Sequence, residues 1–451
     1  MKLLTQEGYR RRIDNISSAD QSNKSYQRRH RIRDYMPGQV TYNLGDYPAA
    51  FSMEPTEYDY NLLKSLAENG VELLQIHEEW NDPIRHLGAD KFTAHDPEGL
   101  QKFVDLCHFF GIKIIPYIST GYFQVTDPDY QECWERQHGD LIDEFFRYGH
   151  CWCGSPEWLE YLLPRTYKVL DQYGFDGIYN DWGYDGYYFV EQATGETDLA
   201  KMHLPYDPLI EDLLSEIYSE IKHRGGVYKI HADRNNAPPC KDKVYDYLWI
   251  GEHVDDDTPG EGKQHEPYIV PCQHCNYSKK MDDEDYYYAR VIPFMQFPLL
   301  KHGRPLGGTG INEPGIHFYK DTSGYIFQQK VQEYNAAHPD GPFVHSIWSS
   351  IPDDVEEYPR WSRYLKLYKP MVTQNSVAYI ELRDCDDILS PLPEKVIASM
   401  FVNEEKYMVV SNLTDADYKL KLSGKWKDRV TGEVGTDFVI KPDKILFLVQ
   451  V

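Results

Sequence analysis

Residues 156–181 read PEWLEYLLPRTYKVLDQYGFDGIYND and contain one complete helix-to-strand unit. The amphipathic stretch 156–173 predicts a helix, and Gly174 is the type of residue that ends one. The apolar run 176–180 predicts a buried strand. Asp181 follows directly, so we expect a carboxylate at the C-terminal end of this strand.

The same alternation of amphipathic stretches and short apolar runs extends outward from this unit in both directions. It predicts strands at 40–44, 71–76, 112–118, 176–180, 227–231 and 245–250, with 292–297 and 343–348 as candidates for the seventh and eighth. Strands that alternate with helices form parallel sheets with the helices outside. We therefore expect an α/β protein whose residues 39–369 form a (β/α)₈ TIM barrel with long loops at 253–290 and 302–340.

The two ends of the chain have different patterns. Short alternating runs at 377–382, 396–402, 406–411, 418–422 and 445–449 predict a small antiparallel β-sandwich over residues 370–451. Residues 1–38 form a basic arm that we expect to dock on the acidic body or on a neighbouring subunit of a homo-oligomer. Its arginines are Arg10, Arg11, Arg12, Arg28, Arg29, Arg31 and Arg33.

Composition narrows the class of partner. The net charge of −25 over 451 residues disfavours nucleic acid, because an acidic surface repels phosphate backbones. No stretch has the length and apolarity of a membrane span, and the first residues lack the apolar core of a signal peptide. We expect a cytoplasmic protein with reduced cysteines and no membrane partner.

Polar and aromatic residues gather at the predicted strand ends, where barrel enzymes carry their active sites. Tyr and Trp can stack on the C–H face of a sugar ring, and the chain contains 37 tyrosines. A carbohydrate is therefore the expected partner. The candidate substrate-binding residues are His77, Glu79, Trp80, Tyr117, Trp182, His231 and Asp233.

Asp181 and Glu252 are the predicted catalytic pair. Glycoside hydrolysis needs one carboxyl group to protonate the leaving oxygen and another to attack the sugar or activate water. Asp181 follows the fourth predicted strand and Glu252 follows the sixth, so both can reach the same mouth of a barrel. We predict a retaining, exo-acting glycosidase with Asp181 as nucleophile, Glu252 as acid/base, and no cofactor.

The run 175–182, FDGIYNDW, resembles the fourth-strand nucleophile motif of the α-galactosidase-like and α-glucosidase-like retaining barrels. The runs 246–252, DYLWIGE, and 153–158, CGSPEW, are similar to a group of uncharacterised glycosyl hydrolases with a barrel and a sandwich. The resemblance implies Asp181 as nucleophile and an acid/base after strand six. The chain departs from the α-galactosidase pattern at Tyr179, where that family has Lys, and at Glu252, where its acid/base is Asp.

Two other functions remain open from the sequence. The barrel could bind carbohydrate without catalysis, or it could be a metal-dependent hydrolase that uses His77, His231, Asp233 and Glu252. The cysteines also allow a structural zinc site, since thiolates at short spacing bind zinc in a reducing compartment. Its ligands would be Cys151, Cys153, Cys272 and Cys275, with ordinary buried thiols as the alternative.

Overall fold

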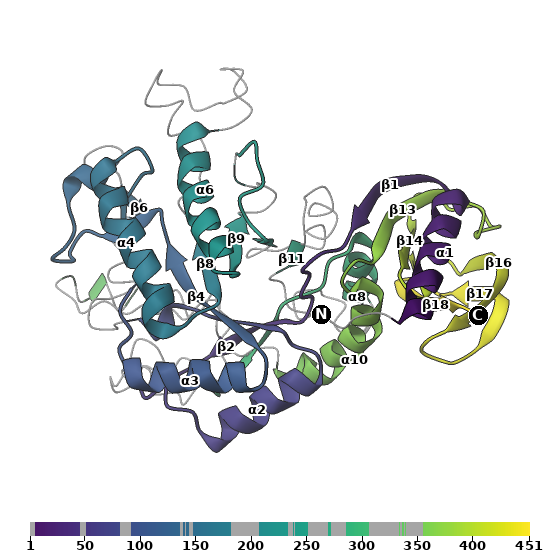
Figure 1. Cartoon of the computed structure of the whole chain (residues 1–451), viewed down its shortest axis with the longest axis horizontal. Coiled ribbons are helices and arrows are strands. Elements are labelled where there is room, and N and C mark those ends of the chain that lie inside the picture. Colours follow the sequence, from purple (N-terminus) through teal and green to yellow (C-terminus); the bar gives the residue numbers. More distant parts are fainter. Residues whose placement is uncertain are drawn as a thin grey trace. The chain divides into compact units, whose positions relative to one another are not determined.

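The structure is a computed structural model. It describes residues 5–45, 51–81, 92–135, 139, 141–143, 148–181, 207–232, 238, 240–250, 269–271, 286–305, 333, 336–337, 339 and 355–451. The chain divides into two compact units (Figure 1). One comprises Gln39–Trp249 and Leu300–Val355, and the other comprises Met1–Gly38, Ile250–Leu299 and Glu356–Val451.

The first unit is built on a parallel sheet, which runs within the unit in the order β10-β9-β8-β4-β3-β2-β12. The strands are β2 (Gln39–Asn43), β3 (Leu73–Ile76), β4 (Lys113–Ser119), β8 (Gly177–Asp181), β9 (Val227–Ala232), β10 (Tyr247–Ile250) and β12 (Leu300–Gly303). The helices that connect them are α2 (Glu57–Glu68), α3 (Pro97–Phe109), α4 (Pro156–Tyr173) and α6 (Pro208–His223). The α/β class with a parallel sheet is therefore confirmed.

Local sequence signals fix where these helices begin and end. Ser155 caps α4 through a 3.2 Å hydrogen bond from the Trp158 N–H, and Gly174 ends the helix in the left-handed conformation. Asp207 caps α6 in the same way as Ser155 caps α4, and each of these helices has Pro in its first turn. Helix α4 occupies the range 156–173 that the sequence predicts.

The sheet curls strongly. The Nζ of Lys229 on β9 donates a 3.1 Å hydrogen bond to Oε1 of Gln39 on β2. Four strand spacings separate β9 from β2 in the sheet order, which would amount to about 19 Å in a flat sheet. Two side chains on the same face can meet over that interval only if the sheet bends around them.

A small excursion follows β4. It comprises β5 (Tyr122–Gln124), β6 (Leu141–Asp143) and β7 (Tyr148–His150), with the short helix η2 (Glu132–Trp134). The rings of Trp134 and Trp158 lie 5.0 Å apart, and Phe123 packs edge-on to both. This aromatic core attaches the excursion to the start of α4.

The second unit is built on an antiparallel sheet of seven strands in the order β1-β13-β14-β15-β18-β16-β17. The strands are β1 (Asn23–Arg31), β13 (Val377–Cys385), β14 (Val396–Val402), β15 (Lys406–Asn412), β16 (Tyr418–Asp428), β17 (Val434–Ile440) and β18 (Lys444–Gln450). The other elements are α1 (Gln6–Ser22), β11 (Ile269–Pro271), α8 (Tyr286–Val291), η3 (Ile292–Phe294), η4 (Val355–Glu357), α10 (Tyr358–Tyr368) and η5 (Lys369–Val372).

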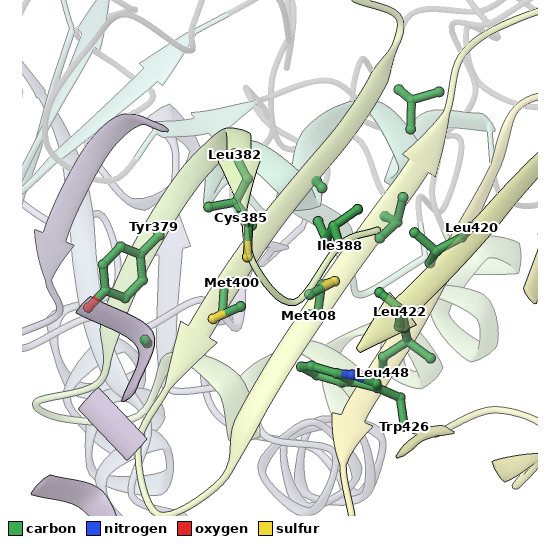
Figure 2. Packing of buried hydrophobic residues seen from close by; sticks show 14 of the residues in the cluster. Tyr379, Leu382, Cys385, Ile388, Met400, Met408, Leu420, Leu422, Trp426 and Leu448 are labelled. Atoms are coloured by element: carbon green, nitrogen blue, oxygen red, sulfur yellow. The ribbon is translucent and has the colours of Figure 1, made fainter. Parts of the chain in front are cut away.

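Every residue of β14 is buried, because both faces of the strand are covered. Met400 joins the hydrophobic core that also contains Ala19 of α1 and Trp426 of β16 (Figure 2). On the other face, the Ser399 hydroxyl donates a 2.7 Å hydrogen bond to the Pro293 carbonyl of η3. The sequence predicts a small antiparallel β-sandwich over residues 370–451, and the structure has an antiparallel sheet there. Its seven strands, which include β1, form one hydrogen-bonded sheet.

The sequence predicts a basic arm over residues 1–38. In the structure they form helix α1 and strand β1, and β1 is part of this sheet. Strand β1 pairs with β13 from Asn23↔Cys385 to Arg31↔Val377. A buried ion pair lies at the C-terminal end of α1, where Lys406 Nζ is 2.6 Å from Asp387 Oδ2. The Ser22 hydroxyl donates to the same carboxylate oxygen at 2.9 Å, which ties the helix end to the sheet.

Two predicted strands differ from the structure. Residues 292–294 of the predicted seventh strand form the 3-10 helix η3, in which Pro293 cannot donate to a strand ladder. The strand that pairs with β2 is instead β12, and the predicted strand 343–348 lies outside the described residues. Among the described residues, no helix is long and apolar enough to cross a membrane.

Candidate active site

The side chains on the outer face of the curled sheet show which residues lie on its inner face. On β2, the Tyr42 hydroxyl donates to Asp59 of α2 at 2.6 Å, and its ring lies 5.1 Å from Phe103 of α3. On β8, Asn180 donates to the Tyr228 hydroxyl at 2.8 Å. Side chains alternate along a strand, so Tyr179 and Asp181 lie on the inner face.

Asp181 is held at both carboxylate oxygens. Its Oδ1 lies 2.7 Å from Nδ1 of His231 on β9, and its Oδ2 accepts a 3.0 Å hydrogen bond from the Tyr117 hydroxyl of β4. An ionised carboxylate only accepts, so the His231 Nδ1 carries the proton in this pair. Asp181 and His231 are each 9% exposed, so this network is nearly closed to solvent within the described part of the chain.

Tyr117 extends the network to β5. Its hydroxyl is hydrogen-bonded to the Tyr122 hydroxyl as well as to Asp181. Burial, followed by the nearby charge of Asp181, raises the pKa of Tyr117 well above its ordinary value. Tyr117 therefore keeps its proton and donates it to the carboxylate in a hydrogen bond.

Four rings form a wall beside Asp181. Tyr179 of β8 lies 4.6 Å from Trp249 of β10 between ring centroids, and His77 lies 5.1 Å from Trp249. The His231 ring is stacked on Trp249 at 5.8 Å. These contacts bring together residues at or near the ends of β3, β8, β9 and β10.

His77 is neutral in this wall. Burial, followed by the positive charges of Lys229 and Lys301, lowers the pKa of His77 well below its ordinary value. The Gln75 amide nitrogen lies 2.9 Å from His77 Nε2, so this ring nitrogen accepts and Nδ1 carries the proton. A neutral imidazole adds no charge to this wall.

Two predicted sugar-binding residues instead support the walls. Trp80 is fully buried, its indole N–H donates to the Tyr117 carbonyl at 3.0 Å, and its ring packs on Tyr173. Glu79 is also fully buried, and its Oε1 accepts the Leu44 N–H at 3.3 Å. These contacts give both side chains a positioning role for the ends of β2 and β4.

The structure brings together Asp181, His77, Tyr117 and His231. The other predicted site residues, Trp182, Asp233, Glu252, Cys272 and Cys275, lie outside the described residues. The sequence analysis did not select Tyr179 and Trp249, which lie beside Asp181 and His231. Tyr179 could have been found from its place two residues before Asp181, because strand residues at that spacing share a face.

Two of the four predicted zinc ligands, Cys151 and Cys153, lie among the described residues. Cys151 and Cys153 are buried, and burial together with the nearby Asp207 carboxylate raises the pKa of Cys153 to about 12. Within the ranges that the structure describes, no group of three or more His, Cys, Asp or Glu side chains could hold a metal ion.

The fold is that of several saccharide-active enzymes. The chain matches the trehalose-6-phosphate hydrolase of Bacillus licheniformis with a TM-score of 0.55 at 11% identity, covering 92% of this chain and 100% of that one. It matches the α-amylase of Geobacillus thermoleovorans with a TM-score of 0.54 at 9% identity, covering 93% and 100%. These matches confirm the predicted resemblance to glycoside hydrolases in fold.

A third structure, the GH36 α-galactosidase of Geobacillus stearothermophilus, gives a TM-score of 0.51 at 10% identity, covering 92% of this chain and 55% of that one. No protein-family model matches the sequence. No curated protein matches it either.

Proposed function

We propose that the protein is a retaining, exo-acting glycoside hydrolase with Asp181 as its nucleophile. The observation that carries this proposal is the Asp181 carboxylate, which follows β8 directly and is hydrogen-bonded at both oxygens inside a wall of aromatic and histidine rings. The shared fold with a trehalose-6-phosphate hydrolase, an α-amylase and an α-galactosidase supports it. We further propose that the curled sheet belongs to a closed (β/α)₈ barrel.

The proposed reaction has two steps. An oxygen of Asp181 attacks the anomeric carbon while the leaving-group oxygen takes a proton from Glu252, which breaks the glycosidic bond and forms a glycosyl-enzyme. Glu252 then takes a proton from water, whose oxygen attacks the same carbon and releases Asp181. Tyr117 and His231 orient the nucleophile, because each donates to one of its oxygens.

The enclosure of Asp181 supports an exo-acting enzyme. Asp181 is 9% exposed, and we propose that its carboxylate lies at the end of a narrow site. Such a site takes one terminal sugar more readily than the middle of a long polymer. We propose that His77, Tyr117, Asp233 and Trp182 form the site for that sugar.

The test is a panel of p-nitrophenyl α- and β-glycosides. We expect turnover of at least one, and proton NMR should show a first product with the anomeric configuration of the substrate. Asp181→Asn should lower kcat by at least about 10⁴-fold, because no other group can form the glycosyl-enzyme. Glu252→Gln should spare p-nitrophenyl substrates and impair those with poor leaving groups.

The matched control is Asp176→Asn. Asp176 lies at the opposite end of β8, where it accepts the Ile114 N–H at 2.9 Å and contacts His108 at 2.8 Å. Its replacement should lower stability and leave kcat within a few-fold of the wild type. An active Asp181→Asn variant would contradict the proposal. Binding without turnover would favour the non-catalytic carbohydrate-binding function, and loss of activity on chelation would favour a metal-dependent hydrolase.

A further inference from the structure

The antiparallel unit contains a cavity of about 1200 Å³ that is separate from Asp181. Its walls come from the N-terminal end of α1, the turn at 373–375 before β13, and the turn at 403–405 that joins β14 to β15. All three segments belong to the same unit. A cavity of this size is large enough for a small organic ligand.

The walls are fixed by hydrogen bonds. The Asn403 amide donates to the Pro370 carbonyl at 3.0 Å and to the Thr373 hydroxyl at 3.2 Å. Asn15 of α1 donates to the Glu404 carbonyl at 3.0 Å. Asn375 has a φ of 67°, and its N–H donates to the Ile32 carbonyl at 2.8 Å. A binding site with walls held in this way loses little entropy when it orders around a ligand.

The charges in the lining nearly cancel. Two arginines, Arg11 and Arg12, face three carboxylates, Asp34, Glu404 and Glu405. Arg11 lies 3.2 Å from Glu405, which pairs one positive charge with a negative one. An anionic ligand would meet three like charges and a cation would meet two, so the lining favours an uncharged ligand.

The other lining groups are donors, acceptors and aromatic rings. Gln374 and Asn375 each offer a side-chain amide, and Tyr9 is 56% exposed. Such a lining suits a ligand with many hydroxyl groups and an apolar C–H face. Neutral saccharides combine these two properties.

We propose that this cavity is a non-catalytic binding site for a neutral saccharide. Tyr9 stacks on one face of a sugar ring, and the amide and charged side chains of the walls bind its hydroxyl groups. The site is independent of Asp181, so it does not depend on the proposed hydrolysis. It would let the protein hold a glycan at a place other than its active site.

The experiment is a glycan-array measurement with the full-length chain carrying Asp181→Asn, so that the glycans stay intact. The array contains neutral, carboxylated and sulfated glycans. We expect binding to at least one neutral class. In the same background, Tyr9→Ala should weaken that binding about tenfold, while Tyr9→Phe should stay within about twofold because the ring remains.

Ile13→Ala is the matched control. Ile13 is also on α1 and is 50% exposed, but it is not part of the cavity lining. Both alanine variants should keep the wild-type melting temperature, because exposed side chains contribute little to stability. Absence of neutral-glycan binding, binding to acidic glycans alone, or equal binding by the Tyr9→Ala and Ile13→Ala chains would each overturn the proposal.

Turnover of aryl glycosides by the chain with native Asp181 is measured separately. Turnover without array binding by the Asp181→Asn chain would overturn the saccharide site alone. Array binding that depends on Tyr9, without any turnover, would overturn the proposed hydrolase alone. The two proposals can therefore fail independently.

Discussion

Asp181 receives a hydrogen bond at each carboxylate oxygen, from His231 on one side and from Tyr117 on the other. A carboxylate held in this way cannot rotate freely about its last bond, so the direction in which it presents its lone pairs is set by β4 and β9. For a nucleophile this orientation matters, because a small misplacement of the reacting atom is costly.

Tyr117→Phe removes one of these hydrogen bonds. A bond to a charged group contributes about 1.5–3 kcal/mol, so kcat/KM should fall by roughly 10- to 150-fold. Tyr228→Phe is the control, because it makes the same chemical change on β9, where the hydroxyl accepts from Asn180 on the outer face. Equal kinetic losses in the two variants would contradict an orienting role for Tyr117.

His77 should make stability depend on pH. Its folded pKa is lowered well below 6.5, mainly by burial. Below about pH 6.5 the unfolded chain takes up a proton at this residue and the folded chain does not, so stability falls as pH falls, by about 1.4 kcal/mol per unit. Urea unfolding from pH 7.5 to 5.5 should show this slope.

His77→Gln should reduce that slope by about 1.4 kcal/mol per pH unit below pH 6.5, because the glutamine does not titrate. The exposed His223 at the end of α6 offers the control, and His223→Gln should keep the wild-type dependence. If the wild type and His77→Gln lose stability in parallel, His77 becomes protonated in the folded chain.

Among the elements, β8 depends on a glycine at its first position. Gly177 has a φ of 150°, and a Cβ at this position would lie 1.8 Å from the Val227 carbonyl oxygen of β9. Gly177→Ala should therefore push β8 and β9 apart and lower the free energy of unfolding by more than about 4 kcal/mol. Denaturant unfolding measures this loss.

Gly111→Ala is the matched substitution. Gly111 also has a positive φ, 73°, but a Cβ there would meet nothing within 4 Å. Its cost should be only the conformational penalty of about 1–2 kcal/mol. If the two alanine variants lose the same stability, close packing against Val227 is not what requires Gly177.

The apolar strands of the parallel sheet were predictable, and the polar one was not. Strands such as β4 and β8 carry apolar runs after a glycine, which is the signal that the sequence analysis used. Strand β12 reads Leu-Lys-His-Gly, and all four residues are buried. A search for apolar runs misses such a strand, because the inner face of this sheet is partly polar.

Site residues at the end of a strand could be predicted from the sequence, whereas those inside a strand were harder to predict. Asp181 and His231 were found by this rule, and the structure joins them. Tyr179 and Trp249 were missed because aromatic residues inside a strand also suit a hydrophobic core. The packing role of Trp80 could not be derived either, since it depends on Tyr173 and Phe175, which lie more than 90 residues later.

At the scale of the whole molecule, the first and last parts of the chain belong to one unit. Strand β1 lies at the edge of the sheet that the C-terminal strands build, and α1 supplies Ala19 to its core. The ion pair of Lys406 with Asp387 is completed by the Ser22 hydroxyl. Residues 1–38 are therefore a structural part of this unit.

Deletion of residues 1–31 should prevent this unit from folding cooperatively. The deletion exposes the edge of β13 and the core surface under α1, and it removes the Ser22 hydroxyl from Asp387. Differential scanning calorimetry should show the loss of one transition. Co-expression of residues 1–38 as a separate peptide should restore it, and a scrambled peptide of equal composition should not. A deletion variant with the wild-type thermogram would contradict this role.

The pairing of β1 with β13 also determines how long β1 stays unpaired during synthesis. The partner of Arg31 is Val377, about 350 residues further along the chain. At about 5–20 residues per second, a nascent β1 waits roughly 20–70 s before its partner leaves the ribosome. During that wait it carries an unpaired strand edge, which is an aggregation hazard. Its sequence, NKSYQRRHR, is rich in positive charge, and mutual repulsion between nascent chains would keep this strand apart until the last strands arrive.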